Sequence, residues 1–202
     1  MSFGIYAPLV EPYFVSGTFQ DFESKVPDLD HRVEIAGIFK AGDRLLLPEE
    51  TPQHLVLDRP GKHPRDIFQT HNGAMVVSQA LRGLMEEMDP ECHQFMPLTI
   101  DNLLDGKNWF ILNVHAKQDS IVDEESDVEQ RFESTGKELM GIPSFGYETI
   151  PLKLTFRKSE MRDLNLWRER RYKGYLFCSD NFEENIRNEK LKFFKFIQAR
   201  DI

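Results

Sequence analysis

Hydrophobic positions are densest in residues 109–114, which read WFILNV. Trp109 and Ile111 fall on one face of an extended chain, and Phe110, Leu112 and Val114 fall on the other. A strand that is covered on both sides has apolar residues on both faces. We therefore predict a central strand over Trp109–Val114, which ends where polar residues take over near His115.

Two other segments repeat one pattern, in which an apolar run, a serine, a helical stretch and a second apolar run follow one another. They are AMVVSQALRGLMEEMDPECHQFMPL (74–98) and YLFCSDNFEENIRNEKLKFFKFIQA (175–199). Ser78 and Ser179 are predicted helix N-caps, because a serine hydroxyl can accept a hydrogen bond from a free backbone N–H of the first turn. Relative to their serines, Phe182 and Ile186 match Leu81 and Met85, and Phe196 matches Phe95.

The spacing of these elements predicts an α+β fold with a mixed or antiparallel sheet, a few helices and two strand–Ser–helix–strand units. Prolines interrupt residues 1–50, which we interpret as an irregular segment packed on an α+β domain at 51–202, so that the chain forms one compact unit. Within that segment, the turn at residues 41–43 favours a short strand pair. His54–Leu57 is a predicted strand, and Asn72-Gly73 is a predicted turn.

Charge narrows the class of partner. The chain of 202 residues carries a formal net charge of −9, and its pI is about 5.2. An acidic protein is not expected to bind nucleic acid or an anionic membrane surface. The first residues lack the pattern of a signal peptide, and no apolar run is long enough for a membrane span, so we expect a cytoplasmic location.

Motifs for catalysis or metal binding are not evident. The six histidines show no HxxxH or HExxH spacing, so no metal site is predicted. The flanks of Ser78 and Ser179, VVSQA and FCSDN, lack the glycines of a nucleophile elbow. Phosphate-binding glycine motifs are missing as well. We therefore expect no catalytic residues, no metal and no cofactor.

An acidic cluster follows the predicted central strand. Its members are Asp119, Asp123, Glu124, Glu125, Asp127 and Glu129. The cluster lacks the DxDxDG pattern of a calcium loop. It is either a solvated acidic loop or a surface that docks a basic partner. The basic run 168–173 could contact phosphate, cover an exposed turn or pair with the protein's own carboxylates.

Three segments together resemble a bacterial family of immunity proteins encoded at toxin/immunity loci. NWFILNVHAKQDSIVDEES (108–126) is similar to the family's central signature, in which an aromatic pair and Leu-Asn-Val precede two aspartates, here Asp119 and Asp123. AMVVSQALRGLMEEM (74–88) resembles its earlier Val–Ser–helix element, and residues 163–196 resemble its closing segment. The similarity covers roughly residues 50–200. Residues 115–118 depart from the more apolar family pattern, so the strand is expected to end sooner.

The resemblance implies a non-enzymatic protein of polymorphic toxin systems that neutralises a cognate toxin domain by binding it, in competition between bacteria. The acidic cluster would suit a basic toxin. Two alternatives remain open from the residues themselves. One is a small-molecule enzyme that uses carboxylates near His115, and the other is a general adaptor protein. A pocket that holds His115 among several converging carboxylates would favour the enzyme. The sequence makes no prediction of oligomeric state.

Overall fold

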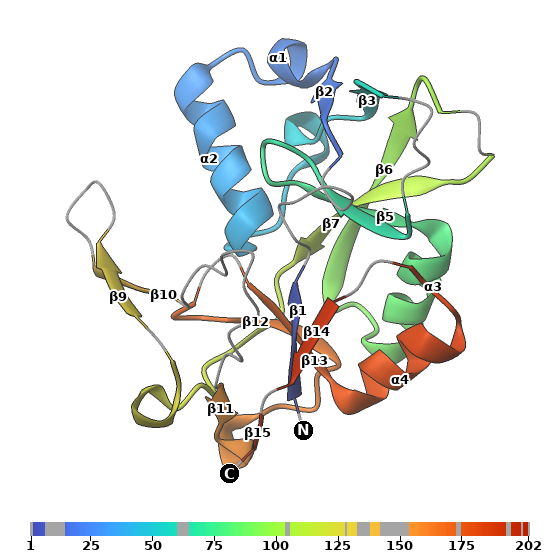
Figure 1. The fold of residues 1–202 in the computed structure, drawn as a ribbon. Helices are drawn as coiled ribbons and strands as arrows, with labels where there is room; N and C mark the ends of the chain where they lie inside the picture. Colours follow the sequence, from blue (N-terminus) through green and yellow to red (C-terminus); the bar gives the residue numbers. More distant parts are fainter. Residues whose placement is uncertain are drawn as a thin grey trace.

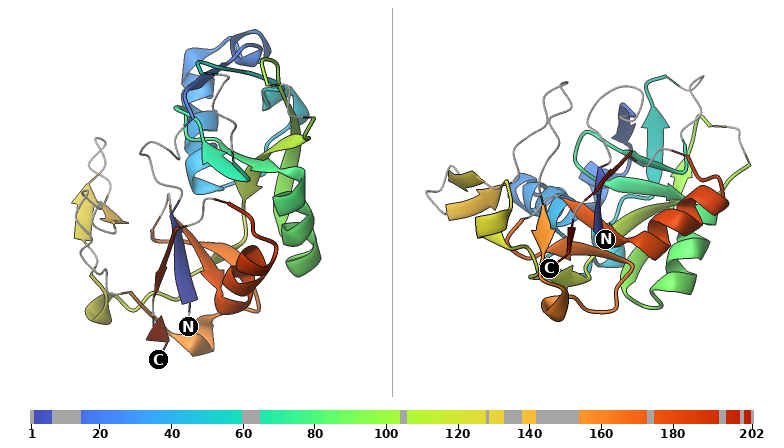
Figure 2. Two further views of the ribbon diagram at one scale, coloured as in Figure 1. Left: turned by 45° about the vertical axis from the view of Figure 1, so that its right-hand side comes forward. Right: turned by 60° about the horizontal axis from the view of Figure 1, so that its bottom comes forward.

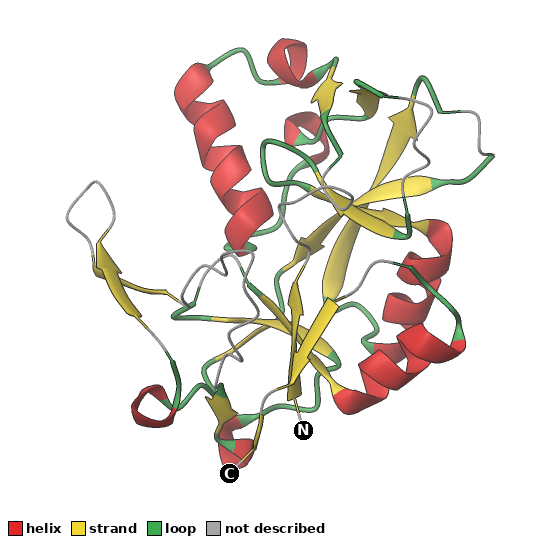
Figure 3. Ribbon diagram, viewed as in Figure 1, coloured by secondary structure: helices red, strands yellow, loops and turns green. Residues whose placement is uncertain are grey.

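The structure, a computed structural model, describes residues 2–6, 15–59, 65–103, 106–127, 129–132, 138–141, 154–172, 175–192, 195–198 and 200–201. Helices and sheets are both present, which confirms the predicted α+β class (Figure 3). The α-helices are α1 (Phe22–Lys25), α2 (Leu29–Ala41), α3 (Gln79–Met88) and α4 (Asp180–Asn188). Single 3-10 turns are η1 (Pro48–Glu50), η2 (Asp123–Glu125) and η3 (Lys158–Glu160).

A six-stranded sheet forms the upper part of the molecule in Figure 1. Its order is β2 (Gly17–Phe19), β3 (His54–Leu57), β6 (His93–Ile100), β7 (Trp109–Val114), β5 (Met75–Ser78) and β4 (Ile67–Gln69). All neighbours are antiparallel except β3 and β6. Strand β7 has three strands on one side and two on the other, and all six of its residues are buried, which confirms the predicted central strand.

A five-stranded sheet forms the lower part. Its order is β14 (Lys195–Gln198), β1 (Ser2–Tyr6), β13 (Leu176–Ser179), β12 (Leu166–Glu169) and β8 (Lys117–Gln118). Strand β1 therefore lies between two strands from the other end of the described chain. Two smaller sheets pair β9 (Glu129–Phe132) with β10 (Glu138–Gly141), and β11 (Thr155–Phe156) with β15 (Arg200–Asp201).

The two predicted strand–Ser–helix–strand units are β5–α3–β6 and β13–α4–β14. Ser78 accepts a hydrogen bond from the backbone N–H of Leu81, and Ser179 accepts one from Phe182, so each serine is the N-cap of its helix. Each serine is the last residue of a strand, and its Oγ also donates to the residue just before the strand that comes earlier in the chain, β4 or β12. Ser78 donates to Asp66 over 2.9 Å, and Ser179 donates to Asn165 over 2.8 Å. Both units are thus built on the same hydrogen-bond pattern.

Hydrogen bonds also connect each unit to the strand segment that precedes the other unit. Asp89, which ends α3, accepts hydrogen bonds from the backbone N–H groups of Asn165 and Leu166 at the start of β12. In return, the backbone N–H of Lys192, just after α4, donates to Asp66 before β4 over 2.8 Å. Helices α3 and α4 lie side by side in both views of Figure 2, and their apolar faces share one hydrophobic cluster.

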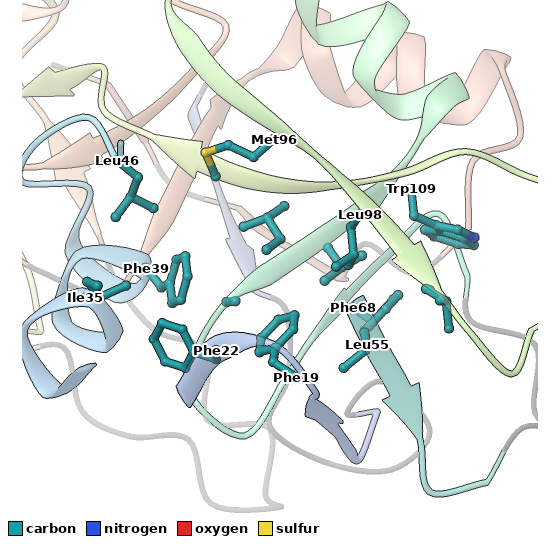
Figure 4. Packing of buried hydrophobic residues seen from close by; sticks show 14 of the residues in the cluster. Phe19, Phe22, Ile35, Phe39, Leu46, Leu55, Phe68, Met96, Leu98 and Trp109 are labelled. Atoms are coloured by element: carbon teal, nitrogen blue, oxygen red, sulfur yellow. The ribbon is translucent and has the colours of Figure 1, made fainter. Parts of the chain in front are cut away.

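A second hydrophobic cluster lies between the six-stranded sheet and α2 (Figure 4). Helix α2 contributes Ile35 and Phe39, which are fully buried. Phe22 of α1 packs between Phe19 and Phe39, with ring centroids 6.4 Å from each. The segment that precedes β3 is therefore part of the core of this sheet.

Helix α2 replaces the strand pair predicted around residues 41–43, and that prediction is wrong. The helix ends at Gly42, which has a φ of 63° and lies so close to Val114 that an added Cβ would sit 1.9 Å from the Val114 carbonyl oxygen. Only glycine fits such a left-handed cap. The described residues of the segment 1–50, which was predicted to be irregular, include β1, β2, α1 and α2.

Candidate functional site

The acidic segment begins where β7 leaves the six-stranded sheet. After β7, the chain forms β8 against β12 of the other sheet and then turns through η2. Figure 1 places the short helix before β9 at the lower left, away from both clusters of packed helices. The segment thus follows β8 of the five-stranded sheet, which the chain enters directly after leaving β7 of the six-stranded sheet.

A buried carboxylate fixes the start of this segment. Glu169 of β12 is only 1% exposed. It accepts hydrogen bonds from the backbone N–H of Ser120 over 2.8 Å, from the Ser120 hydroxyl over 2.6 Å and from the Trp167 indole N–H over 3.0 Å. A buried carboxylate with this many donors is well satisfied, so residues 119–121 are held firmly against β12.

Arg171 binds two of the predicted site residues. Its guanidinium donates to Asp119 over 2.6 Å, to Asp123 over 2.5 Å and to the carbonyl oxygen of Ile121 over 2.6 Å. The hydroxyl of Tyr172 also donates to Asp123. Partial burial alone would lower the pKa of Arg171, but its bonds to the two aspartates raise it. Burial and the bond to Asp123 raise the pKa of Tyr172.

The other site residues differ in exposure. Glu124 and Asp127 are exposed, whereas Glu125 is half-buried, and Glu129 lies in β9, for which only the backbone is described. Asp123 is also half-buried, because Arg171 and Tyr172 cover it. Asp123 and Glu125 are therefore less exposed than the residues of a solvated acidic loop would be. The basic run at 168–173 supplies the arginine that pairs with the protein's own carboxylates, one of the three roles that the sequence left open for it.

Arg168, from the same run, has a different role. It is 1% exposed and donates to the carbonyl oxygens of Val114 and Phe39, over 3.2 and 3.3 Å. Its remaining nitrogen, Nη1, has no hydrogen-bond partner among the described residues. Burial lowers the pKa of Arg168 to about 10. The side chain connects β12 to the ends of β7 and α2, so its role is structural.

A cavity of about 610 Å³ does hold His115. Its charged lining consists of two exposed carboxylates, Glu91 and Asp163, and three basic side chains, Lys117, Arg162 and Arg170. Such a mixture is not the converging set of carboxylates that the enzyme alternative requires.

His115 and Cys92, which both line this cavity, have perturbed pKa values. Burial lowers the pKa of His115, and the nearby His93 lowers this pKa further. Burial and the charges of Asp89 and Glu91 raise the pKa of the Cys92 thiol. A thiol with a raised pKa is a poor nucleophile at neutral pH, so the cavity does not favour cysteine chemistry.

The described residues contain no group of three or more His, Cys, Asp or Glu side chains placed to hold a metal ion. Within the same part of the chain, no helix has the length and apolar character needed to cross a membrane.

Comparison with known families identifies the family to which the chain belongs. The model of the family described as "Immunity protein family (Imm11)" matches residues 18–201. The chain belongs to the Imm11 immunity protein family. No curated protein matches the chain. The Imm11 match confirms the resemblance seen in residues 108–126 and extends it toward the N-terminal side, where it includes α1 and α2. Membership in Imm11 suggests a protein that acts by binding and not by catalysis.

Sequence reasoning found the Imm11 signature but missed the residues that support it. Glu169 and Tyr172 lie in a charged run, RERRYK (168–173), that looks solvated by composition. The available signal was the flanking apolar pair Leu166-Trp167, since alternation from a buried strand would turn some of these charged residues inward.

Proposed function

We propose that this Imm11 protein binds a cognate bacterial toxin and neutralises it, and so protects the producing cell from its own toxin or that of its siblings. The observation that carries the proposal is the family match over residues 18–201. The proposed setting is a polymorphic toxin system used in competition between bacteria, with the protein acting in the cytoplasm. Binding without catalysis also agrees with the mixed charges around His115.

The acidic segment 119–129 is the proposed contact with a basic toxin domain. Arg171 neutralises part of the charge of Asp119 and Asp123, and it holds the loop in one conformation. Glu124 and Asp127 remain exposed, so they can act on an approaching partner. Clustered exposed carboxylates increase the association rate of an oppositely charged protein and fix its orientation. Neither nucleic acid nor a membrane is a proposed partner.

Co-expression tests the function itself. The toxin domain encoded beside this gene is expressed alone, with the wild-type protein and with an unrelated acidic protein of similar size. We expect only the wild-type protein to restore survival and to co-purify with the toxin. Growth arrest that the wild-type protein does not relieve, together with no co-purification, would refute the proposed function.

A triple substitution tests the acidic contact. Glu124→Gln, Glu125→Gln and Asp127→Asn are combined, and Asp123 is left intact because Arg171 and Tyr172 depend on it. We expect association with the toxin to slow about tenfold or more at low salt, with a weaker salt dependence, since exposed charges act mainly on the association rate.

The matched control removes the same charge elsewhere. Glu86, Glu87 and Glu184 are exposed on α3 and α4, and their combined change to Gln leaves the segment 119–129 unaltered. If both triple variants slow association equally, only net charge matters, and the acidic segment is not the contact.

A further inference from the structure

A groove of about 620 Å³ lies between the edge strand β2 and the helix α2. One wall is β2, and the other is the side of α2 that carries Arg32, Val33 and Ala36. The start of α1 and the turn at residues 71–72 bound it further. Figure 1 shows β2 and α2 at the upper end of the molecule, far from the segment that carries η2. The groove is therefore separate from the acidic segment.

The β2 wall presents to this groove backbone groups that pair with no other described strand. In the antiparallel pair with β3, Gln20 donates to the carbonyl oxygen of His54, and Asp58 donates to that of Ser16. Backbone groups alternate in direction along a strand, so the N–H and C=O of Gly17 and Phe19 point away from β3. Strand β2 ends its sheet, and these groups form a short edge on which another strand can pair.

Apolar side chains line the groove beside that edge. Phe19 and Phe22 are buried in the wall. Val33 is 65% exposed, and Leu29, one turn earlier on the same face of α2, is 64% exposed. Val33 and Leu29 therefore offer exposed apolar surface to a partner beside the strand edge. Backbone pairing combined with an apolar pocket is the arrangement that proteins use to bind an extended peptide.

The charges around the groove indicate which sign of charge its partner carries. Residues 21–34 contain five carboxylates and two basic side chains. Of the two, Arg32 donates to the carbonyl oxygen of Val26 over 3.0 Å and lies 3.9 Å from Glu23. Lys25 donates to the carbonyl oxygen of Thr51 over 2.8 Å. Glu23 lines the groove and its side chain is 84% exposed. The segment 21–34 beside the groove therefore carries more carboxylates than basic side chains, and this excess of negative charge favours a basic partner.

We infer that this groove binds an extended, basic segment of the toxin, which adds as a strand to the edge of β2. An apolar side chain of that segment packs against Val33 and Phe19, and neighbouring lysine or arginine side chains face Glu23. The inference rests on the proposed function, and it adds a second contact to the one proposed for residues 119–129.

Two arginine substitutions test the groove against the toxin. Val33→Arg puts a bulky cation in the groove. Leu47→Arg makes the same kind of change at a leucine that is 51% exposed and does not line the groove. Both sites are on the surface, so both variants should melt like the wild type. We expect Val33→Arg to weaken toxin binding about tenfold or more, as the loss of an interface anchor does, and Leu47→Arg to leave it within about twofold.

A peptide titration tests the groove without the toxin. A five-residue peptide of alternating lysine and valine is added to the ¹⁵N-labelled protein, and one of alternating glutamate and valine serves as control. The amide signals of Gly17, Phe19 and Val33 should shift with the basic peptide only, and not in the Val33→Arg variant. Absent shifts, or equal shifts with both peptides, would overturn the inference.

The outcomes separate the two proposals. A wild-type protein that fails to bind or neutralise the toxin refutes the proposed function, and the peptide titration still decides the chemistry of the groove. Toxin binding that Val33→Arg and Leu47→Arg affect equally overturns the groove alone. Self-association that Val33→Arg abolishes while toxin binding stays unchanged would assign the groove to a second copy of the chain, which also overturns the inference.

Discussion

Replacing Glu50 with Gln should destabilise the protein by about 2 kcal/mol at pH 7. Glu50 is 6% exposed and accepts two hydrogen bonds of 2.8 Å from Arg44, one of 2.9 Å from the backbone N–H of Leu47 and a contact of 3.0 Å from His31. It thereby joins η1 to α2. Arg44, first among its partners, lowers the pKa of Glu50 from 4.5 to about 2.

The size of the effect follows from that pKa. A shift of this size corresponds to at most about 3.4 kcal/mol, since one unit is worth about 1.4 kcal/mol. A glutamine keeps some of the hydrogen bonds, and Arg44 is 37% exposed, so water replaces part of what it loses. We therefore expect about two thirds of this upper limit, which should lower the melting temperature by roughly 4–8 °C.

The effect should depend on pH with a definite sign. Because the folded pKa lies below the unfolded value, the carboxylate stabilises the fold fully above pH 4.5, and this contribution is lost as the pH falls towards 2. The difference between wild type and Glu50→Gln should narrow by about 0.8 kcal/mol between pH 7 and pH 4. Urea unfolding of both proteins across this range measures it.

Glu34 provides the control, because its carboxylate also contacts Arg44 but is 59% exposed. Glu34→Gln should cost less than about 0.5 kcal/mol at every pH. A Glu50→Gln penalty that equals the Glu34→Gln penalty, or that stays constant from pH 7 to pH 4, would refute the reasoning.

Three further predictions concern the connections between elements. Ser78→Ala and Ser179→Ala should each lower the free energy of unfolding by about 1–2 kcal/mol, measured by urea unfolding, because each variant loses an N-cap and a hydrogen bond to the neighbouring strand. A loss at only one serine would contradict the equivalence of the two units. Arg168→Met should have a free energy of unfolding within about 1 kcal/mol of the wild type, whereas Arg168→Ala should lose about 3 kcal/mol or more because it leaves a cavity in the core. Equal losses would show that the hydrogen bonds of the guanidinium dominate. Arg171→Met should cost about 1–2 kcal/mol and loosen the acidic loop, seen as faster hydrogen exchange of the Ile121 amide; unchanged exchange would show that Glu169 alone holds the loop.

Local patterns predicted the elements that local interactions stabilise. An apolar run on both faces identified β7, and a serine before an amphipathic stretch identified the starts of α3 and α4. Helix α2 could not be found in this way. Its apolar residues point both inward, as Ile35 does, and outward, as Leu29 and Val33 do, so it lacks a single apolar face, and the glycine at position 37 further weakened the helical signal.

Contacts between distant residues could not be predicted. The bonds of Arg171 to Asp119 and Asp123, and the burial of Glu169 under Ser120, depend on the parallel pairing of β8 with β12. The opposite charges of the two segments allow them to pair, but nothing in either segment identifies the strand beside which it lies. The acidic cluster was visible in the sequence, but the division into bound and exposed carboxylates was not, because it is set by that pairing.

The position of β1 has a consequence for how the protein is made. Ser2 pairs with Ser179, and Phe3 pairs with Gln198, so this strand emerges from the ribosome long before either neighbour. Translation at about 5–20 residues per second leaves it without its sheet for roughly ten seconds or more. The upper sheet does not include β1 and can fold first, but the lower sheet must close a loop between β1 and β13. If the proposed function is correct, protection that depends on the lower sheet begins only after residues 176–198 have been translated, which sets a minimum delay between the synthesis of β1 and neutralisation of the toxin.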